Sequence, residues 1–141
     1  MSTAPPSVTG TGLLDALAGA AHRVERRIEA ALGPDGPGLD RWRVLDLLAD
    51  GEGRPMSGIA AAVRVPAPTL TKIVDRLIDQ GLVYRRVDET DRRRVLVLLA
   101  DRGRELHARL APAVREVETA LLRDLGPASA ELRGHLDRLA R

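Results

Sequence analysis

The segment from residue 66 to residue 81 places the strongest constraint on the fold, because its apolar residues recur with the period of an α-helix. They fall at three- and four-residue steps and therefore share one helix face: Leu70, Ile73, Val74 and Leu77. The opposite face begins with small and hydroxylated side chains and continues with charged ones, mostly cationic near its middle: Pro68, Thr69, Thr71, Lys72, Asp75, Arg76 and Asp79. This pattern predicts a helix that packs one face on a core and leaves the other free to approach a polyanion.

A shorter helix is predicted directly before this one. Ser57 is a suitable N-cap for a helix over residues 58–64, in which Ile59 and Val63 share the buried face. Pro66 follows, and it suits the start of the next helix, where no backbone N–H is needed. A short helix, a tight turn and a longer helix with an exposed polar face form a helix-turn-helix.

A β-hairpin is predicted after the second helix. Gly81 suits the position that closes that helix, since glycine readily adopts the left-handed conformation found there. Strands are expected over residues 82–87 and 94–99 with a turn between them, and residues 54–56 are a candidate third strand. Five arginines flank the turn: Arg85, Arg86, Arg92, Arg93 and Arg94. This concentration of cations on one hairpin indicates an anionic partner.

A resemblance to the MarR family of winged-helix transcriptional regulators is carried by the run PAPTLTKIVDRLIDQGLVYRR, followed by DETDRRR. Asp88, Asp91, Arg92 and Arg93 stand at the positions of the family's wing motif, and the upstream run LDRWRVLDLLAD is similar to the helix that precedes its DNA-binding motif. The resemblance implies a mainly α fold with a small β wing. In that fold, a winged helix-turn-helix is joined to N- and C-terminal dimerisation helices.

Four regions are predicted along the chain: a disordered tail over 1–10, an N-terminal dimerisation helix and loop over 11–38, a winged helix-turn-helix DNA-binding region over 39–100, and C-terminal dimerisation helices over 101–141. Asp40 is expected to cap the helix before the helix-turn-helix. Asp101 is expected to cap the long helix after the wing, which Pro112 should bend. A last helix is expected over residues 128–139, with these leucines facing inward: Leu132, Leu136 and Leu139.

Composition and charge narrow the class of protein. The chain has no cysteine, which excludes disulfides and thiol redox sensing. Its apolar runs fall short of the roughly 20 residues of a membrane span, and a secretion signal is absent, so a cytoplasmic protein is expected. The histidines lack metal-ligand spacing and known catalytic motifs are missing, so the sequence predicts no metal, no cofactor and no enzyme. Residues 64–104 hold ten Lys or Arg against six Asp or Glu, the charge balance of a nucleic-acid-binding surface.

The helix-turn-helix and the wing supply the candidate DNA-binding residues. In the major groove, lysine and arginine can bind guanine acceptors and threonine methyls can contact thymine. Arg92 is expected in the adjacent minor groove, and Ser57 is expected at a phosphate. The full predicted set is Ser57, Pro68, Thr69, Thr71, Lys72, Arg76, Arg92, Arg93 and Arg94. The family resemblance also implies that a wing arginine, Arg93, pairs with Asp75 and ties the wing to the helix.

Each of these patterns has a simpler interpretation. The charged side chains of the second helix can form a solvated face stabilised by neighbouring pairs. The arginines at 92–94 can protect a sheet edge from aggregation. Trp42 is more often a core residue than a ligand contact, and Asp88 and Asp91 suit a turn better than a metal site. The ordered combination of these features favours DNA binding.

The predicted function is a sequence-specific transcriptional regulator: a homodimeric repressor that binds a pseudo-palindromic operator in double-stranded DNA and is released by a small effector. The alternatives are a winged-helix module that binds protein and a DNA-binding protein with no effector. The resemblance implies an aromatic or phenolic effector between the dimer helices and the winged region, with these candidate contacts: His22, Arg26, Trp42 and His107. Ala100 departs from the family pattern, in which a capping threonine is common there.

Overall fold

The computed structural model describes residues 12–141, and the tail predicted over residues 1–10 lies outside them. The elements follow one another in this order: α1 (Leu13–Leu32), α2 (Leu39–Leu47), β1 (Arg54–Pro55), α3 (Met56–Val63), α4 (Ala67–Asp79), β2 (Val83–Val87), β3 (Val95–Leu99), α5 (Asp101–Leu125), the 3-10 helix η1 (Gly126–Ala128) and α6 (Ser129–Leu139). The prediction of a mainly α fold with a small β wing is therefore confirmed.

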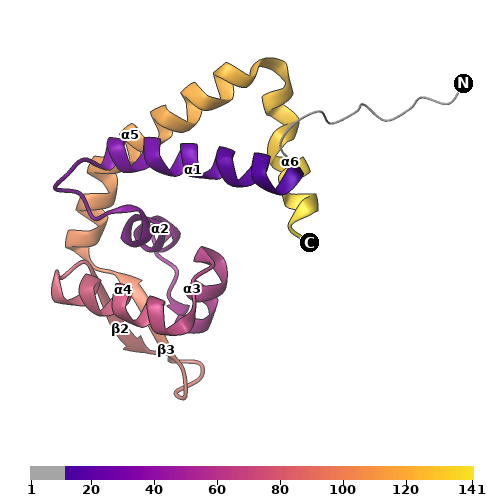
Figure 1. Ribbon diagram of the computed structural model, residues 1–141. Coiled ribbons are helices and arrows are strands. Elements are labelled where there is room, and N and C mark those ends of the chain that lie inside the picture. Colours follow the sequence, from indigo (N-terminus) through magenta and orange to yellow (C-terminus); the bar gives the residue numbers. More distant parts are fainter. Residues whose placement is uncertain (1–11) are drawn as a thin grey trace, which may run out of the picture.

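The described chain consists of a winged lobe, residues 39–100, beneath two long helices (Figure 1). Helix α1 crosses above α2, and α5 rises along one side of the lobe and continues beyond it. Helix α6 lies at the far end of α5, away from the lobe. The chain that leaves β3 thus connects the winged lobe directly to α5.

Two clusters of buried apolar side chains hold these parts together. The larger cluster lies inside the winged lobe, where α2, α3, α4 and the sheet meet. It buries Leu70, Val74 and Leu77 to 1% exposure or less, so the predicted inward face of α4 is confirmed. The smaller cluster joins α1, α2 and α5 through Leu32, Trp42, Ala111 and Val114.

The wing sheet has three antiparallel strands in the order β1, β3, β2. Val97 on the central strand lies opposite Arg54 on one side and Arg85 on the other. The predicted third strand is therefore present. It ends at Pro55, because Met56 already begins α3.

The end of α4 confirms the role predicted for Gly81, which has a φ of 71°. The Gly81 N–H donates to the Ile78 carbonyl at 2.9 Å, and the Leu82 N–H donates to the Leu77 carbonyl at 2.9 Å. These two bonds form a Schellman motif, which satisfies the last carbonyls of the helix and turns the chain into β2.

The predicted helix caps are wrong at three positions. Ser57, Asp40 and Asp101 lie within the first turn of their helices, and the N-cap residues are Pro55, Gly38 and Ala100. None of these N-caps makes a side-chain cap hydrogen bond. Capping patterns locate a helix start only to within a residue or two, and here the backbone becomes helical before the polar side chain.

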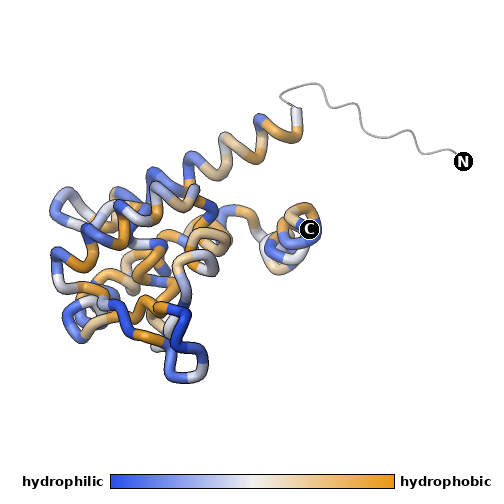
Figure 2. The backbone as a smooth tube through the Cα atoms, turned by 90° about the horizontal axis from the view of Figure 1, so that it is seen from below, coloured by the Kyte–Doolittle hydropathy of each residue, from blue (hydrophilic) through white to orange (hydrophobic). Residues whose placement is uncertain are grey.

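The prediction that three leucines of α6 face inward is wrong for two of them, Leu136 and Leu139, whereas Leu132 is half-buried. Leu136 is 41% exposed and Leu139 is 62% exposed, because no other element of the described chain covers this face. Leu13 and Leu14 at the start of α1 are similarly exposed. Figure 2 shows apolar residues on both of these projecting segments. Helix α5 contains Pro112 and changes direction along its length, as predicted (Figure 1).

Candidate nucleic-acid interface

The outward face of α4 presents the predicted major-groove residues to solvent. Pro68, Thr69, Thr71, Lys72 and Arg76 are all exposed. The Thr71 hydroxyl donates to the Ala67 carbonyl at 3.0 Å, so its one hydrogen-bond donor is used within the helix, while its methyl group is available for an apolar contact. One helix therefore brings cations and a methyl group to the same surface.

The start of α4 favours an anion. Pro66 is the N-cap, and the first turn contains no acidic residue. The free backbone N–H groups and the positive end of the helix dipole are therefore uncompensated by a carboxylate. Ser57 is exposed on the neighbouring helix, in the first turn of α3.

The wing turn is built by its own carboxylates. Asp88 Oδ1 accepts hydrogen bonds from the Thr90 hydroxyl at 2.8 Å and from the Thr90 N–H at 3.0 Å. These two donors, the hydroxyl first, lower the pKa of Asp88. Asp91 Oδ1 accepts from the Arg93 N–H at 3.1 Å. The turn-forming interpretation of both acids is supported, and residues 12–141 contain no cluster of three side chains suited to a metal ion.

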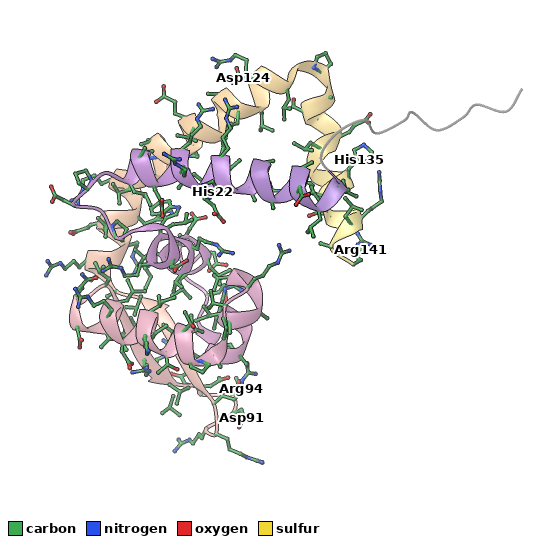
Figure 3. All side chains as sticks on the ribbon, viewed as in Figure 1. His22, Asp91, Arg94, Asp124, His135 and Arg141 are labelled. Atoms are coloured by element: carbon green, nitrogen blue, oxygen red, sulfur yellow. The ribbon has the colours of Figure 1, made fainter. Side chains whose placement is uncertain are left out.

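The turn carries the three wing arginines away from the lobe. Figure 3 labels Asp91 near its tip and Arg94 closer to the strands. Arg92, Arg93 and Arg94 are all exposed. The Asp88 N–H donates to the Arg94 carbonyl at 2.9 Å, so the backbone beneath these side chains is held in place.

The wing is tied to α4 by Arg85, and the pairing of Arg93 with Asp75 expected from the family resemblance is wrong. Arg85 Nη2 lies 2.8 Å from Asp75 Oδ1. Side chains two residues apart share one face of a strand, and Val83 on the same face of β2 is buried in the lobe core. Arg85 therefore faces α4, whereas Arg93 lies in the turn beyond both strands. Side chains alternate between the two faces of a strand, so the position of Arg85 two residues after Val83 could have identified it as the partner of Asp75.

A second ion pair supports the other edge of the wing sheet. Asp50 accepts a hydrogen bond from the Glu52 N–H at 2.9 Å, the main cause of its lowered pKa, and it also pairs with Arg54 on β1. This pair was not among the predicted contacts. It braces the loop that leads into β1.

The structure divides the four candidate effector residues into two pairs. Trp42 and His107 are stacked, with ring centroids 4.9 Å apart and planes inclined by 5°, and His107 Nε2 lies 2.8 Å from Asp46 Oδ1. Trp42 is only 4% exposed, which supports its interpretation as a core residue.

His22 and Arg26 lie elsewhere, on α1. They line a shallow hollow of about 410 Å³ together with Gly19, Arg23, Arg27 and Ala30. Figure 3 labels His22 midway along the helix. The hollow is cationic but does not include Trp42 or His107.

A further cleft, which the sequence analysis did not predict, lies where α4, α5 and the loop after α1 meet. Its volume is about 510 Å³. Asp79 and Leu82 line it from the winged lobe, and Arg102 and Arg109 line it from α5. Within residues 12–141, no helix combines the length and the apolar character that crossing a membrane requires.

Comparisons with known proteins agree with this geometry. A sequence model of the MarR family matches residues 35–94. The chain spans about half the length of two curated transcriptional regulators, from Thauera aromatica and Neisseria gonorrhoeae, to which it is 33% identical over the matched part.

Three solved structures resemble the chain over nearly its whole length. A probable transcriptional regulator from Pseudomonas aeruginosa is 30% identical, with a TM-score of 0.78 and coverage of 90% of this chain and 96% of that one. The transcriptional repressor CouR, bound to a 23-mer DNA duplex, is 28% identical, with a TM-score of 0.81 and coverage of 99% and 100%. NadR in complex with 4-hydroxyphenylacetate is 26% identical, with a TM-score of 0.80 and coverage of 98% and 99%.

Proposed function

The chain belongs to the MarR family, and from this premise we propose that it regulates transcription as a homodimer that binds a pseudo-palindromic operator in double-stranded DNA. It acts as a repressor and is released from DNA by a small effector. The observation that carries the proposal is the tie between Asp75 and Arg85, which holds the cationic face of α4 and the arginine-rich wing together as one surface.

Helix α4 enters the major groove in this proposal. Lys72 and Arg76 donate to guanine acceptors, and the methyl group of Thr71 contacts a thymine methyl. The N-terminus of α4 and Ser57 on α3 lie against the phosphate backbone, which sets the register of the helix on the duplex. The exposure of all these side chains and the absence of acid in the first turn of α4 support this docking.

The wing enters the adjacent minor groove. Arg92 reaches its floor, where a narrow A·T-rich groove concentrates negative potential. Arg93 and Arg94 neutralise nearby phosphates. The ordered turn supports this role because its hydrogen bonds to Asp88 and Asp91 present the arginines on a fixed backbone.

Two copies associate through their terminal helices. The exposed leucines of α1, α5 and α6 form the proposed dimer surface: Leu13, Leu14, Leu17, Leu122, Leu125, Leu136 and Leu139. Apolar side chains at this exposure are stabilised when a second copy covers them. A two-fold dimer then places two copies of α4 in successive major grooves, about 34 Å apart.

A small aromatic or phenolic anion is the proposed effector, as NadR in complex with 4-hydroxyphenylacetate suggests by analogy. His22 and Arg26 supply a cationic hollow for its carboxylate. The Trp42 and His107 stack lies where α2 meets α5, so a ligand that disturbs it changes how the winged lobe sits on the dimer helices.

The first test is a salt-dependent anisotropy titration of the full chain against DNA from upstream of its own gene, with scrambled DNA of equal length as control. We expect a preference of about a thousandfold or more for the upstream DNA, as is typical of specific binding. Equal, steeply salt-dependent binding to both duplexes would contradict operator recognition. Absence of binding at low salt would favour the protein-interaction alternative.

A further inference from the structure

Helix α5 begins unusually close to the backbone of the winged lobe. Gly103, in the first turn of α5, is buried against Leu82. A Cβ added to Gly103 would lie 2.0 Å from the Leu82 carbonyl oxygen and 2.8 Å from Leu99 Cδ1. Real Cβ atoms essentially never come within 3.0 Å of a heavy atom outside their own residue and its chain neighbours, so only glycine permits this approach.

Leu82 has little freedom to move away. Its carbonyl accepts a hydrogen bond from the Ala100 N–H at 3.0 Å, and its own N–H donates to the Leu77 carbonyl at 2.9 Å. Its side chain is buried, with 6% exposure. Any side chain at position 103 is therefore accommodated by a movement of α5, since both peptide groups of Leu82 are already bound.

Leu82 also connects α4 to α5. Through its N–H, Leu82 is bonded to the last turn of α4, which carries the proposed DNA contacts. Through its carbonyl, it is bonded to Ala100, the N-cap of α5. Helix α5 continues for 25 residues toward the proposed dimer surface. The close contact between Gly103 and Leu82 therefore sets the direction of α4 relative to the dimer helices.

We propose that Gly103 is a positioning residue that sets the separation of the two α4 helices in the dimer, and hence the half-site spacing of the operator. The inference rests on the proposed function. In Gly103→Ala, the distance between the new Cβ and the Leu82 carbonyl oxygen must rise from 2.0 Å to 3.0 Å. This moves the first turn of α5 by at least about 1 Å. Because the shift occurs in both protomers of a two-fold dimer, the separation of the two α4 helices changes by about 2 Å. This is more than half of the roughly 3.4 Å between successive base pairs.

The first measurement needs neither DNA nor dimerisation. Because the chain has no native cysteine, spin labels can be placed on the wing and on α5 through Glu89→Cys and Thr119→Cys, and labelled chain is diluted tenfold with unlabelled chain. We expect Gly103→Ala to shift or broaden the intrachain label distance by about 1 Å or more. Gly134→Ala is the matched control, because a Cβ at that helical glycine meets nothing within 4 Å.

The second measurement uses operator duplexes with one base pair inserted or deleted between the half-sites. We expect Gly103→Ala to lose about tenfold affinity on the natural spacing and less on one altered spacing, whereas Gly134→Ala keeps the order of preference of the unmodified protein. A merely destabilising substitution would weaken binding to every spacing alike. An unchanged label distance and an unchanged spacing preference in folded Gly103→Ala would overturn the inference.

Should Gly103→Ala fail to fold, Ala100→Pro perturbs the same junction from the other side of the Leu82 carbonyl. The φ of Ala100 is −76°, which proline can adopt, and the substitution replaces the N–H that binds the Leu82 carbonyl with a ring carbon, so residue 100 must move away from that oxygen. We expect a broader label distance and a relaxed spacing preference, and an unchanged result for both would also overturn the inference. If the unmodified protein shows no operator preference, the proposed function fails, while the label distance still decides the role of Gly103.

Discussion

Arg85 on β2 binds Asp75 on α4 through a 2.8 Å contact between Nη2 and Oδ1, and this contact joins the wing to the helix beside it. Both side chains are half exposed, so the pair contributes less than about 1 kcal/mol to folding. Its importance lies in alignment, because two elements that bind neighbouring grooves must keep one relative orientation.

Asp75→Asn distinguishes alignment from simple charge. Loss of a carboxylate near DNA strengthens binding, whereas loss of the tie weakens it. We expect the second effect to dominate on the operator, with affinity falling about tenfold. The matched control is Asp79→Asn, which removes an exposed α4 carboxylate that makes no ion pair within residues 12–141. Tighter operator binding by both variants would argue against the tie.

Arg92→Ala tests the minor-groove assignment. We expect weaker DNA binding and a salt dependence whose slope falls by about one, as for the loss of one cationic contact. Affinity measured at several salt concentrations gives the slope. Arg133→Ala on α6 removes the same charge from another exposed site and should change neither quantity. An unaltered slope for Arg92→Ala would refute the assignment.

Arg64→Gly should make the protein more stable. Arg64 closes α3 with a φ of 56° and a ψ of 50°, and it is the only non-glycine residue with positive φ among those described. This left-handed conformation costs a residue with a Cβ about 1 kcal/mol, which glycine avoids. Urea unfolding should show a gain of that size. Arg64→Ala removes the same side chain but keeps the strain, so it should show no comparable gain.

Trp42→Ala should be strongly destabilising. Trp42 is buried between α1, α2 and α5 and stacked on His107, so truncation leaves a cavity and an unpaired ring. We expect a loss of about 3 to 5 kcal/mol in the free energy of unfolding, measured by circular dichroism in urea. Tyr84, the other aromatic residue, is 43% exposed, and Tyr84→Ala should cost less than about 1 kcal/mol.

The wing turn should loosen in acid. Hydrogen bonds from Thr90 lower the pKa of Asp88 below its ordinary 3.8, so the folded turn favours the ionised carboxylate. The resulting stabilisation of the folded turn is complete above pH 3.8. It is lost as the pH falls through the lowered pKa of Asp88 in the folded state. The NMR shift of the Thr90 amide should report this transition. Asp88→Asn keeps an acceptor oxygen but cannot ionise, and its Thr90 amide should show no such transition.

Predictions based on regular spacing were confirmed inside the winged lobe, but not for α6, where Leu136 and Leu139 lie exposed. The inward face of α4, the Gly81 helix closure and the strands of the wing depend on neighbours within about seven residues, whose geometry the backbone periods of 3.6 and 2 dictate. Capping residues were less well predicted, because a polar side chain near a helix start can sit at the cap or in the first turn. Ser57, Asp40 and Asp101 all lie in the first turn.

The candidate site was predicted in outline and corrected in its contacts. The exposed residues of α4 and the wing lie on their elements as expected. The partner of Asp75 was misassigned, because several arginines lie near Asp75 along the chain. Only the face of β2 that is turned toward α4 selects Arg85. The four candidate effector residues did not form one site, since Trp42 is enclosed by a packing cluster of three helices.

By itself, the sequence determined the helix-turn-helix, the wing and the concentration of positive charge on them, because periodicity, turn chemistry and charge are local properties of the chain. Only the tertiary structure decided which arginine binds Asp75, that His107 covers Trp42, and that Gly103 lies against the Leu82 carbonyl. Each of these contacts joins separate elements. The residues that meet in each contact are selected by the close packing of side chains in space. Residue spacing along the chain does not specify this packing.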